Sequence, residues 1–454
     1  MTVGHVDVLA LAQRLAAAPE RPGGEAAEAV SMPVIRQWCA AMGDRNPCYT
    51  DAATAVGSVH DGPVAPPAMV QVWTMPGLDG RAGGTPADEV LSALRASGYT
   101  GVVATNCEQD YDRYLRPGEL PRTTTRLGAV TGPKLTALGD GYFITWHTTW
   151  YSGEQRVARM TFRLLQFRPA DPAASPPESA SAQGPYPLRP AINADTAFFW
   201  AGAKAGELRI QRCGGCGKLR HPPGPMCAHC HSAAHDYVVA SGRGEIFTYV
   251  VHHHPPVPGK KTPFAVAVIQ LPEGVRVTGN VLAVPPDQLR IGMPVEVTYE
   301  RADDDLVLPQ WKPTRDGADV LPELAVPLTT TMVVTTAIAT RDFTPVHHDR
   351  AAARAQGAPD IFLNILTTMG LVQRFVTDWA GPGAIVRSIA VRLGAPAYAG
   401  DTLTLAGWVT DRGADGSVAI GVRGVCGLGD HVTGAVRLDL PGGGGRLAER
   451  SAPR

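Results

Sequence analysis

The sequence predicts an α+β protein in which two similar outer domains flank a β-rich middle domain. Three observations carry this prediction: a motif that occurs once in each half of the chain, strand-like runs that follow each copy, and two cysteine pairs between the copies. The chain has 454 residues, enough for about three domains of ordinary size. Because 44% of the residues are hydrophobic and 18% are charged, the chain can form several packed cores.

Two segments of biased composition mark the expected domain boundaries. Residues 169–190 are rich in proline, alanine and serine and lack an apolar repeat, which is typical of an extended tether. A shorter break lies at residues 312–323. We therefore expect a first domain over residues 1–168, a middle domain over 191–315 and a last domain over 320–443.

The overall charge and the N-terminus argue against several classes of protein. The formal net charge is -1, whereas proteins that grip a phosphate backbone usually carry a basic excess. Gln13 and Arg14 interrupt the apolar stretch near the N-terminus, so we expect no secretory signal. No run of eighteen apolar residues occurs, so we expect no membrane span. Paired cysteines without a signal indicate a reducing compartment, and we expect a cytoplasmic protein.

The outer domains share a short motif, Asp-x-x-Pro, followed by a second aspartate. The first copy reads GDRNPCYTDAATAVG from Gly43, and the second reads RDFTPVHHDRAAARAQG from Arg341. In each copy the second aspartate, Asp51 or Asp349, is well placed to cap a short alanine-rich helix, which ends near a glycine. The repeated order of elements predicts an internal repeat.

A longer apolar stretch follows each motif, and strand-like segments come after it. Residues 361–379, IFLNILTTMGLVQRFVTDW, fit a buried helix because nearly every face is apolar, and APPAMVQVWTM at 65–75 is the counterpart in the first domain. The strand-like segments alternate or are rich in β-forming residues; they lie at 142–152, 156–167, 402–411 and 418–428.

The middle domain contains a pattern that is typical of a zinc site. CGGCGKLRHPPGPMCAHC places two Cys-x-x-Cys pairs ten residues apart, with ligands at Cys213, Cys216, Cys227 and Cys230. Each pair can form a tight knuckle that supplies two thiolates to a tetrahedral ion. Four thiolates leave no open coordination position, so we expect a structural and not a catalytic zinc. The alternative is a set of reduced cysteines without metal.

Short strands between glycine and proline turns follow this site and suit a small barrel of the OB type. Residues 252–254 are three histidines, but successive strand side chains point to opposite faces, so we expect a loop or strand-end role and not a metal site. An OB barrel also raises the alternative of nucleic-acid binding. That alternative needs a basic groove with stacking aromatics, whereas the basic residues are dispersed here; they are Arg243, Lys260, Lys261, Arg276 and Arg290.

Asp342 and His347 are the candidate catalytic residues. A carboxylate and an imidazole near one water can activate that water and protonate a carbon, as hydration of an α,β-unsaturated thioester requires. The turn at Pro345 could bring the two side chains to one side. On its own this spacing is also compatible with a capped turn and a surface histidine.

The segment DFTPVH resembles the motif Asp-x-Asn-Pro-x-His of the MaoC-like (R)-specific enoyl-CoA hydratases. Asp342, Pro345 and His347 match, while Thr344 replaces the asparagine at a position close to the substrate. The resemblance implies a hotdog fold, one long helix wrapped by an antiparallel sheet, and an acyl-CoA substrate. It also implies that Asp342 and His347 jointly activate water and return the proton. A backbone N–H at the start of the central helix, around Asn364, would hold the thioester oxygen.

The first copy of the motif matches at Asp44, Asn46 and Pro47 but has Tyr49 where the histidine belongs. A phenol with a pKa near 10 is a poor base at neutral pH. We therefore expect a degenerate first hotdog that pairs with the last domain and shapes the acyl pocket. Whether the two hotdogs pair within one chain or between chains is left open by the sequence.

The order of the three domains resembles the two subunits of actinobacterial steroid side-chain hydratases, joined in one chain. The middle domain is similar to the ribbon and OB-fold domains that accompany thiolase-like proteins. This resemblance implies a steroid side-chain enoyl-CoA substrate and a thiolase-like aldolase partner, and we also expect a homo-oligomer. The sequence leaves two alternatives: a non-catalytic scaffold that binds acyl-CoA, and a nucleic-acid-binding protein.

Overall fold

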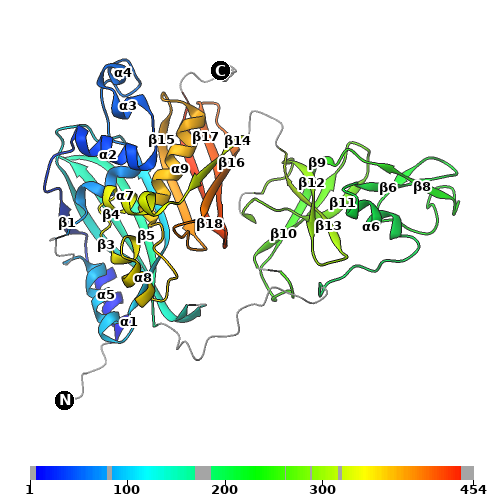
Figure 1. Cartoon of the computed structure of the whole chain (residues 1–454), viewed down its shortest axis with the longest axis horizontal. Coiled ribbons are helices and arrows are strands. Elements are labelled where there is room, and N and C mark those ends of the chain that lie inside the picture. Colours follow the sequence, from blue (N-terminus) through cyan, green and yellow to red (C-terminus); the bar gives the residue numbers. More distant parts are fainter. Residues whose placement is uncertain are drawn as a thin grey trace. The chain divides into compact units, whose positions relative to one another are not determined.

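The computed structural model describes residues 7–78, 84–136, 138–168, 186–260, 262–286, 289–314 and 320–440. Contacts divide the chain into two compact units (Figure 1). One unit joins residues 1–174 to residues 321–454, and the other comprises residues 175–320. Most of the tether predicted from composition, residues 169–185, lies outside the described residues.

The first unit is built on one sheet of ten strands within the described residues (Figure 1). Five strands come from each outer domain, and the two sets lie next to each other in the sheet. In order across the sheet, the strands are β1 (Arg21–Glu25), β3 (Pro121–Thr136), β4 (Gly139–Ser152), β5 (Gln155–Phe167), β2 (Gly101–Tyr111), β15 (Ile385–Leu393), β18 (Gly429–Asp439), β17 (Ser417–Cys426), β16 (Thr402–Arg412) and β14 (Val320–Pro327).

The two outer domains meet where β2 pairs with β15. The pairing is antiparallel and runs from Ser388 opposite Asp110 to Arg392 opposite Asn106. Next to it, the Val386 backbone N–H donates to the Tyr114 hydroxyl at 2.7 Å, so a second bond crosses the same boundary. The two hotdogs therefore pair within one chain, which the sequence alone had left open.

The central helices of the two hotdogs differ. In the last domain α9 (Ile365–Ala380) is the predicted buried helix, and thirteen of its sixteen residues are buried. In the first domain the corresponding apolar stretch forms only a 3₁₀ helix, η1 (Pro67–Thr74). Pro66 and Pro67 at its start supply no N–H donors, and Pro76 soon after its end cannot continue a helix.

The other helices of this unit surround the two central ones. They are α1 (Val8–Ala16), α2 (Met32–Met42), α3 (Pro47–Thr50), α4 (Ala52–Val56), α5 (Pro86–Ala96), α7 (Thr330–Ala339), the 3₁₀ turn η4 (Pro345–His347) and α8 (Arg350–Ala355).

A glycine lets α2 of the first domain approach α9 of the last. A Cβ atom at Gly370 would lie 2.8 Å from the Trp38 ring and 3.0 Å from the Met42 sulfur. Both of these side chains are almost completely buried. The cores of the two hotdogs are therefore continuous, and this position has no room for a side chain.

The second unit combines a three-stranded ribbon with a five-stranded sheet among the described residues. The ribbon has β6 (Arg209–Cys213), β7 (Leu219–Arg220) and β8 (His235–Val239), preceded by α6 (Ala197–Lys204). The sheet has the order β11 (Arg276–Asn280), β10 (Phe264–Gln270), β9 (Arg243–His252), β12 (Pro294–Arg301) and β13 (Val307–Pro313).

A bridge between Val281 and Trp311 joins the two ends of this sheet, as the predicted OB barrel requires. The first of the three consecutive histidines, His252, is the last residue of β9, and the other two follow it in the loop. The predicted strand-end role is therefore confirmed. Among the described helices, none has the length and apolar character needed to cross a bilayer.

Candidate active site

The turn that carries Asp342 begins where α7 ends. Arg341 adopts a left-handed conformation with φ 55°, which directs the chain away from the helix. The Asp342 side chain then folds back over its own turn. Its Oδ1 accepts hydrogen bonds from the Thr344 hydroxyl at 2.7 Å and from the Thr344 backbone N–H at 3.3 Å. The Thr344 hydroxyl thus fixes one oxygen of the carboxylate. It does not cap η4, whereas Asn46, at the same position of the first copy, accepts from the Cys48 N–H at 3.0 Å and caps its helix.

His347 closes the same turn, in η4, and faces the other carboxylate oxygen. Its Nδ1 lies 2.8 Å from the Phe362 carbonyl oxygen; since a carbonyl can only accept, Nδ1 carries the proton. Nε2 is therefore the basic nitrogen of the neutral ring, and it lies 3.6 Å from Asp342 Oδ2. This gap exceeds a direct hydrogen bond, but one water at about 2.8 Å from each atom fits beside it. The side chains of His347 and Asp342 are 10% and 14% exposed, so solvent reaches both.

The start of α9 lies close to this pair because Phe362, which holds His347, is two residues before Asn364. Asn364 caps the helix: its Oδ1 accepts from the Thr367 N–H at 2.7 Å, and its Nδ2 donates to the Thr340 hydroxyl at 2.9 Å. The Asn364 side chain therefore ties the start of α9 to the end of α7. Its backbone N–H has no acceptor among the described residues.

A buried histidine on β18 hydrogen-bonds to the first turn of α9. His431 on β18 is 2% exposed. Its Nδ1 donates to the Ala395 carbonyl at 2.8 Å, and its Nε2 lies 2.9 Å from the Thr368 hydroxyl. Burial lowers the pKa of His431, which keeps the ring neutral and its Nε2 an acceptor from Thr368.

The first copy of the motif forms the same turn but has no histidine. Asp44 Oδ1 accepts from the Asn46 N–H at 3.0 Å, as Asp342 does from Thr344. Tyr49 stands in the place of His347 and is completely buried. Burial raises the pKa of its hydroxyl well above the usual value, so Tyr49 cannot act as a base near neutral pH.

A glutamine from the last domain fills the first copy of the site. The side-chain oxygen of Gln373, on α9, accepts from the Ala68 N–H at 2.8 Å, at the start of η1. Its side-chain nitrogen donates to Asp44 Oδ2 at 3.4 Å. The helix-start N–H and the carboxylate of the first copy are therefore both engaged by a side chain of the protein itself, and all three groups are buried.

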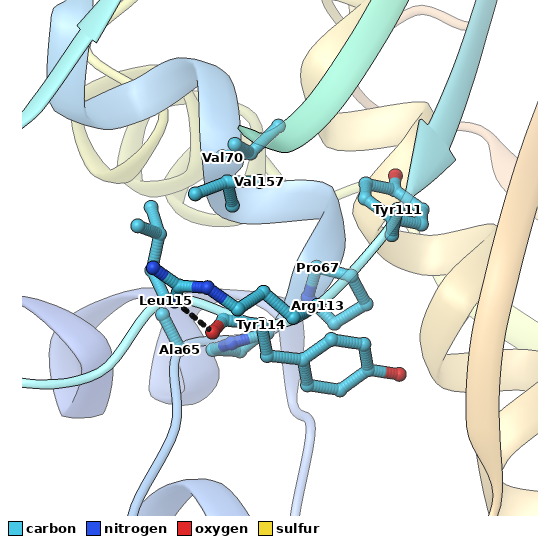
Figure 2. A pocket seen from close by; sticks show the side chains of 9 residues that line it. Ala65, Pro67, Val70, Tyr111, Arg113, Tyr114, Leu115 and Val157 are labelled. Carbon is cyan, nitrogen blue, oxygen red and sulfur yellow. Dashed lines mark hydrogen bonds between the residues drawn. The ribbon is translucent and has the colours of Figure 1, made fainter. Parts of the chain in front are cut away.

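The cavity that remains beside η1 is small and its polar groups are already engaged. It measures about 10 Å³, space for about one water, and its lining includes Pro67, Val70 and Val157. Figure 2 shows that Arg113 folds back onto the Tyr114 carbonyl, a bond of 3.0 Å. The Tyr111 hydroxyl, on the other side of the cavity, donates to the Gln109 side chain at 2.7 Å. The first domain therefore offers no open acyl site at this position.

The four cysteines of the ribbon converge as predicted. Their sulfur atoms all lie within 4.8 Å of one another, with Cys213 and Cys230 3.5 Å apart and Cys216 and Cys227 3.7 Å apart. A tetrahedron with Zn–S bonds of about 2.3 Å has edges of about 3.8 Å, so the set fits zinc. Backbone N–H groups lower the pKa of the Cys227 thiol to about 6, which favours the thiolate that a metal needs.

Four family models match successive segments of the chain. The model described as MaoC like domain matches residues 312–423, and the FAS1-like dehydratase domain region matches 22–160. The ChsH2 rubredoxin-like zinc ribbon domain matches 200–236, and the ChsH2 C-terminal OB-fold domain matches 237–300. A solved MaoC-like dehydratase has the same fold, with a TM-score of 0.53 and 17% identity over 95% of this chain and all of its own.

Two curated relatives define the family more closely. The alpha subunit of the 3-oxo-4,17-pregnadiene-20-carboxyl-CoA hydratase of Mycobacterium tuberculosis is 49% identical over 291 residues, 64% of this chain and 92% of the subunit. The beta subunit of that hydratase is 57% identical over 121 residues, 27% of this chain and 93% of the subunit. The chain belongs to this family of MaoC-like enoyl-CoA hydratases, and it unites counterparts of both subunits in one polypeptide.

The sequence predicted the Asp342–His347 pair, the Asn364 N–H and the cysteines as site residues, and the structure brings the pair together and the four sulfur atoms together; Gln373 was not predicted. A signal was present, since Gln373 interrupts the apolar run Met369–Val372 of a helix that was predicted to be buried on nearly every face. Its partners Asp44 and Ala68 lie 329 and 305 residues away in sequence, so no local pattern could identify them.

The buried carboxyl of Asp44 predicts a characteristic dependence of stability on pH. Burial, the main cause, raises its pKa from 3.8 to about 6, so the folded state holds the proton more tightly than the unfolded state does. The stabilisation from this group is therefore present below pH 4 and is lost as pH rises through 6. We expect the unfolding free energy of wild type, minus that of Asp44→Asn, to fall by about 2–3 kcal/mol between pH 4 and pH 8 in urea titrations.

Asp51→Asn is the matched control for this measurement. Hydrogen bonds from Thr54 and Ala53 lower the pKa of the exposed Asp51 carboxyl, so its contribution should have the opposite sign and diminish as the solution is acidified. A wild-type minus Asp44→Asn difference that is constant or rises with pH would contradict the buried, proton-binding Asp44.

The sulfur geometry predicts one tightly held zinc ion per chain. We expect about one equivalent of zinc by atomic emission, and Cys227→Ser should lose it together with the cooperative unfolding of the ribbon. Cys426→Ser, which changes a cysteine of the last domain, should retain the metal. Full metal content in the Cys227→Ser variant would show that the four thiolates are not the ligands.

Proposed function

We propose that the chain hydrates an α,β-unsaturated acyl-CoA at the Asp342–His347 pair. The proposal is carried by the pairing of His347 Nε2 with Asp342 Oδ2, 3.6 Å apart on side chains that are 10% and 14% exposed, while the Phe362 carbonyl engages the other ring nitrogen. The MaoC like domain model matches residues 312–423, which include both members of the pair, and this match supports the proposal.

The proposed reaction follows from the positions of these groups. A water between His347 Nε2 and Asp342 Oδ2 gives a proton to the pair as its oxygen attacks the β-carbon, and negative charge develops on the thioester oxygen. The Asn364 backbone N–H stabilises that oxygen. The pair then returns a proton to the α-carbon, so that H and OH are added across the double bond and the product is a β-hydroxyacyl-CoA.

Thr344 and Phe362 act on the geometry of the pair and not on the substrate carbon. The Thr344 hydroxyl occupies Oδ1 of Asp342 and leaves Oδ2 for the water. The Phe362 carbonyl holds the proton on Nδ1 and keeps Nε2 basic. In this way each member of the pair presents a single acceptor to the same water.

A steroid side-chain enoyl-CoA is the substrate that we propose. The two M. tuberculosis relatives are named as subunits of a hydratase for a pregnadiene carboxyl-CoA, and this chain matches more than nine tenths of each. A steroid thioester is therefore the first substrate to test, with a short linear enoyl-CoA as its comparison.

We predict that His347→Gln and Asp342→Asn each lower kcat by a factor of about 10² to 10⁴, because each removes a proton acceptor while preserving the shape of the site. The measurement is the loss of the conjugated thioester absorbance with each enoyl-CoA. His348→Gln is the matched control, since that side chain is exposed and, within the described part of the chain, hydrogen-bonds only to the Phe343 carbonyl, at 3.1 Å. Wild type without turnover of either substrate would favour the acyl-CoA-binding scaffold.

The ribbon and barrel are proposed to dock a thiolase-like aldolase that cleaves the hydrated product. This part carries exposed apolar side chains along two strands, and surface of this kind is typical of interaction sites; they are Tyr237 and Val239 on β8 and Phe247 and Val250 on β9. The zinc would be structural, holding the ribbon that presents β8. We place the chain in the cytoplasm, where its eight cysteines, none of which forms a disulfide, remain reduced.

Val250→Glu tests the docking surface, because a charge in an apolar contact must be desolvated. We expect it to weaken binding of a purified thiolase-like steroid aldolase at least tenfold by calorimetry while hydration is unchanged. Leu428→Glu is the control: Leu428 is also 64% exposed but lies between β17 and β18 of the hotdog unit. Equal binding by wild type and Val250→Glu would remove β9 from the docking surface.

A further inference from the structure

The residue before the catalytic aspartate has an unfavourable backbone conformation. Arg341 has φ 55°, a left-handed conformation that favours glycine because a side chain crowds the backbone there. Its N–H donates to Ile338 and the N–H of Asp342 to Ala337, both at 3.0 Å, which is the usual way for a helix to end in this conformation.

The first copy of the motif ends its helix in the same way with a glycine. Gly43 has φ 66°. Its N–H donates to Ala40 at 3.2 Å, and the Asp44 N–H donates to Cys39 at 2.8 Å. The fold therefore accepts glycine at this position, and the copy with the catalytic pair has an arginine instead. Strained non-glycine residues persist mainly where the side chain has a role.

In both copies a guanidinium of the last domain lies against a glycine of the first domain. In the first copy, Arg374 of α9 lies against Gly43, with Nη1 2.6 Å from the place of a Cβ atom. In the last copy, Arg341 itself reaches toward Gly77 of the first domain, with Nη2 3.0 Å from the place of a Cβ atom. The residue that follows the helix is the glycine of the contact in the first copy (Gly43) and the arginine of the contact in the last copy (Arg341).

Only one of these two guanidinium groups is already engaged. Arg374 donates to the Met42 carbonyl at 2.9 Å and to Asp378 at 3.4 Å. The half-buried Arg341 has no hydrogen-bond or ion-pair partner for its guanidinium among the residues that the structure describes. Its N–H donors are therefore available to a ligand that enters beside Asp342.

We propose that Arg341 binds a phosphate of the coenzyme A part of the substrate; this inference rests on the proposed hydratase function. A guanidinium presents paired donors that match phosphate oxygens. From a Cα atom about 3.8 Å from that of Asp342, the side chain can place this charge up to about 15 Å from the reacting carbon. A partly bent pantetheine arm spans this distance. Arg341 is thus a binding residue, and its contribution is made equally before and during the reaction.

The test compares Arg341→Gly with wild type on the same acyl group carried by coenzyme A and by pantetheine. Glycine suits the backbone here, so the variant should fold and its Tm should rise by about 2 °C. With the coenzyme A thioester we expect KM to increase about tenfold or more and kcat to stay within twofold. With the pantetheine thioester, which has no phosphate, the two proteins should have the same KM.

Arg354→Gln is the control for charge. It removes one positive charge from the same segment as Arg341→Gln does, and the two variants are compared. Arg354 is exposed on α8, and its Nε contacts the Pro359 carbonyl at 3.4 Å, so KM should not change. A thioester of 3′-dephospho-coenzyme A separates the phosphates. If substitution of Arg341 does not raise KM for this thioester, Arg341 binds the 3′-phosphate. If KM still rises, Arg341 binds the pyrophosphate.

An unchanged KM for the coenzyme A thioester in Arg341→Gly would overturn the proposal, as would an equal increase for the pantetheine thioester. Calorimetric binding of free coenzyme A separates this failure from a failure of the hydratase function. If wild type turns over no substrate, binding weakened about tenfold by Arg341→Gly still supports the phosphate contact, and unweakened binding refutes it.

Discussion

The antiparallel pairing of β2 with β15 is the contact on which the rest of the hotdog unit depends. It joins two five-stranded sheets into one and brings α9 of the last domain against η1 and α2 of the first. Neither domain could place its central helix in this way alone, because Gly370 contacts Trp38 and Met42 of the other domain. The active-site pair, the helix start at Asn364 and the glutamine that fills the first copy all derive their positions from this shared core.

The two copies of the site show how one scaffold can keep a single centre. In the last copy His347 Nε2 and Asp342 Oδ2 face each other on side chains that are partly exposed, and the Asn364 N–H has no acceptor among the described residues. In the first copy the imidazole is replaced by a buried phenol, and the amide of Gln373 satisfies the remaining N–H and carboxylate. Satisfying those groups matters, because unpaired buried polar groups are destabilising, and burial already raises the pKa of the Asp44 carboxyl to about 6.

Local chemistry made part of this arrangement predictable from the sequence. Asp51 and Asp349 cap their helices as expected, and the cysteine spacing alone identified the metal site, because both features depend on residues close in the chain. The shortness of η1 could have been anticipated from its prolines. Other features depend on contacts across some three hundred residues: Gln373 with Ala68, Arg341 beside Gly77, and β2 with β15. Periodicity reports which face of an element is buried but not what covers it, so the sequence could not reveal these partners.

We expect each chain to have one acyl-CoA site that is open and one that Gln373 has closed. The most direct test is the stoichiometry with which a saturated, unreactive steroid acyl-CoA binds to the full chain in an isothermal titration. We predict one molecule bound per chain. Two molecules per chain with similar affinities would contradict the account, because the first hotdog would then also be open to substrate.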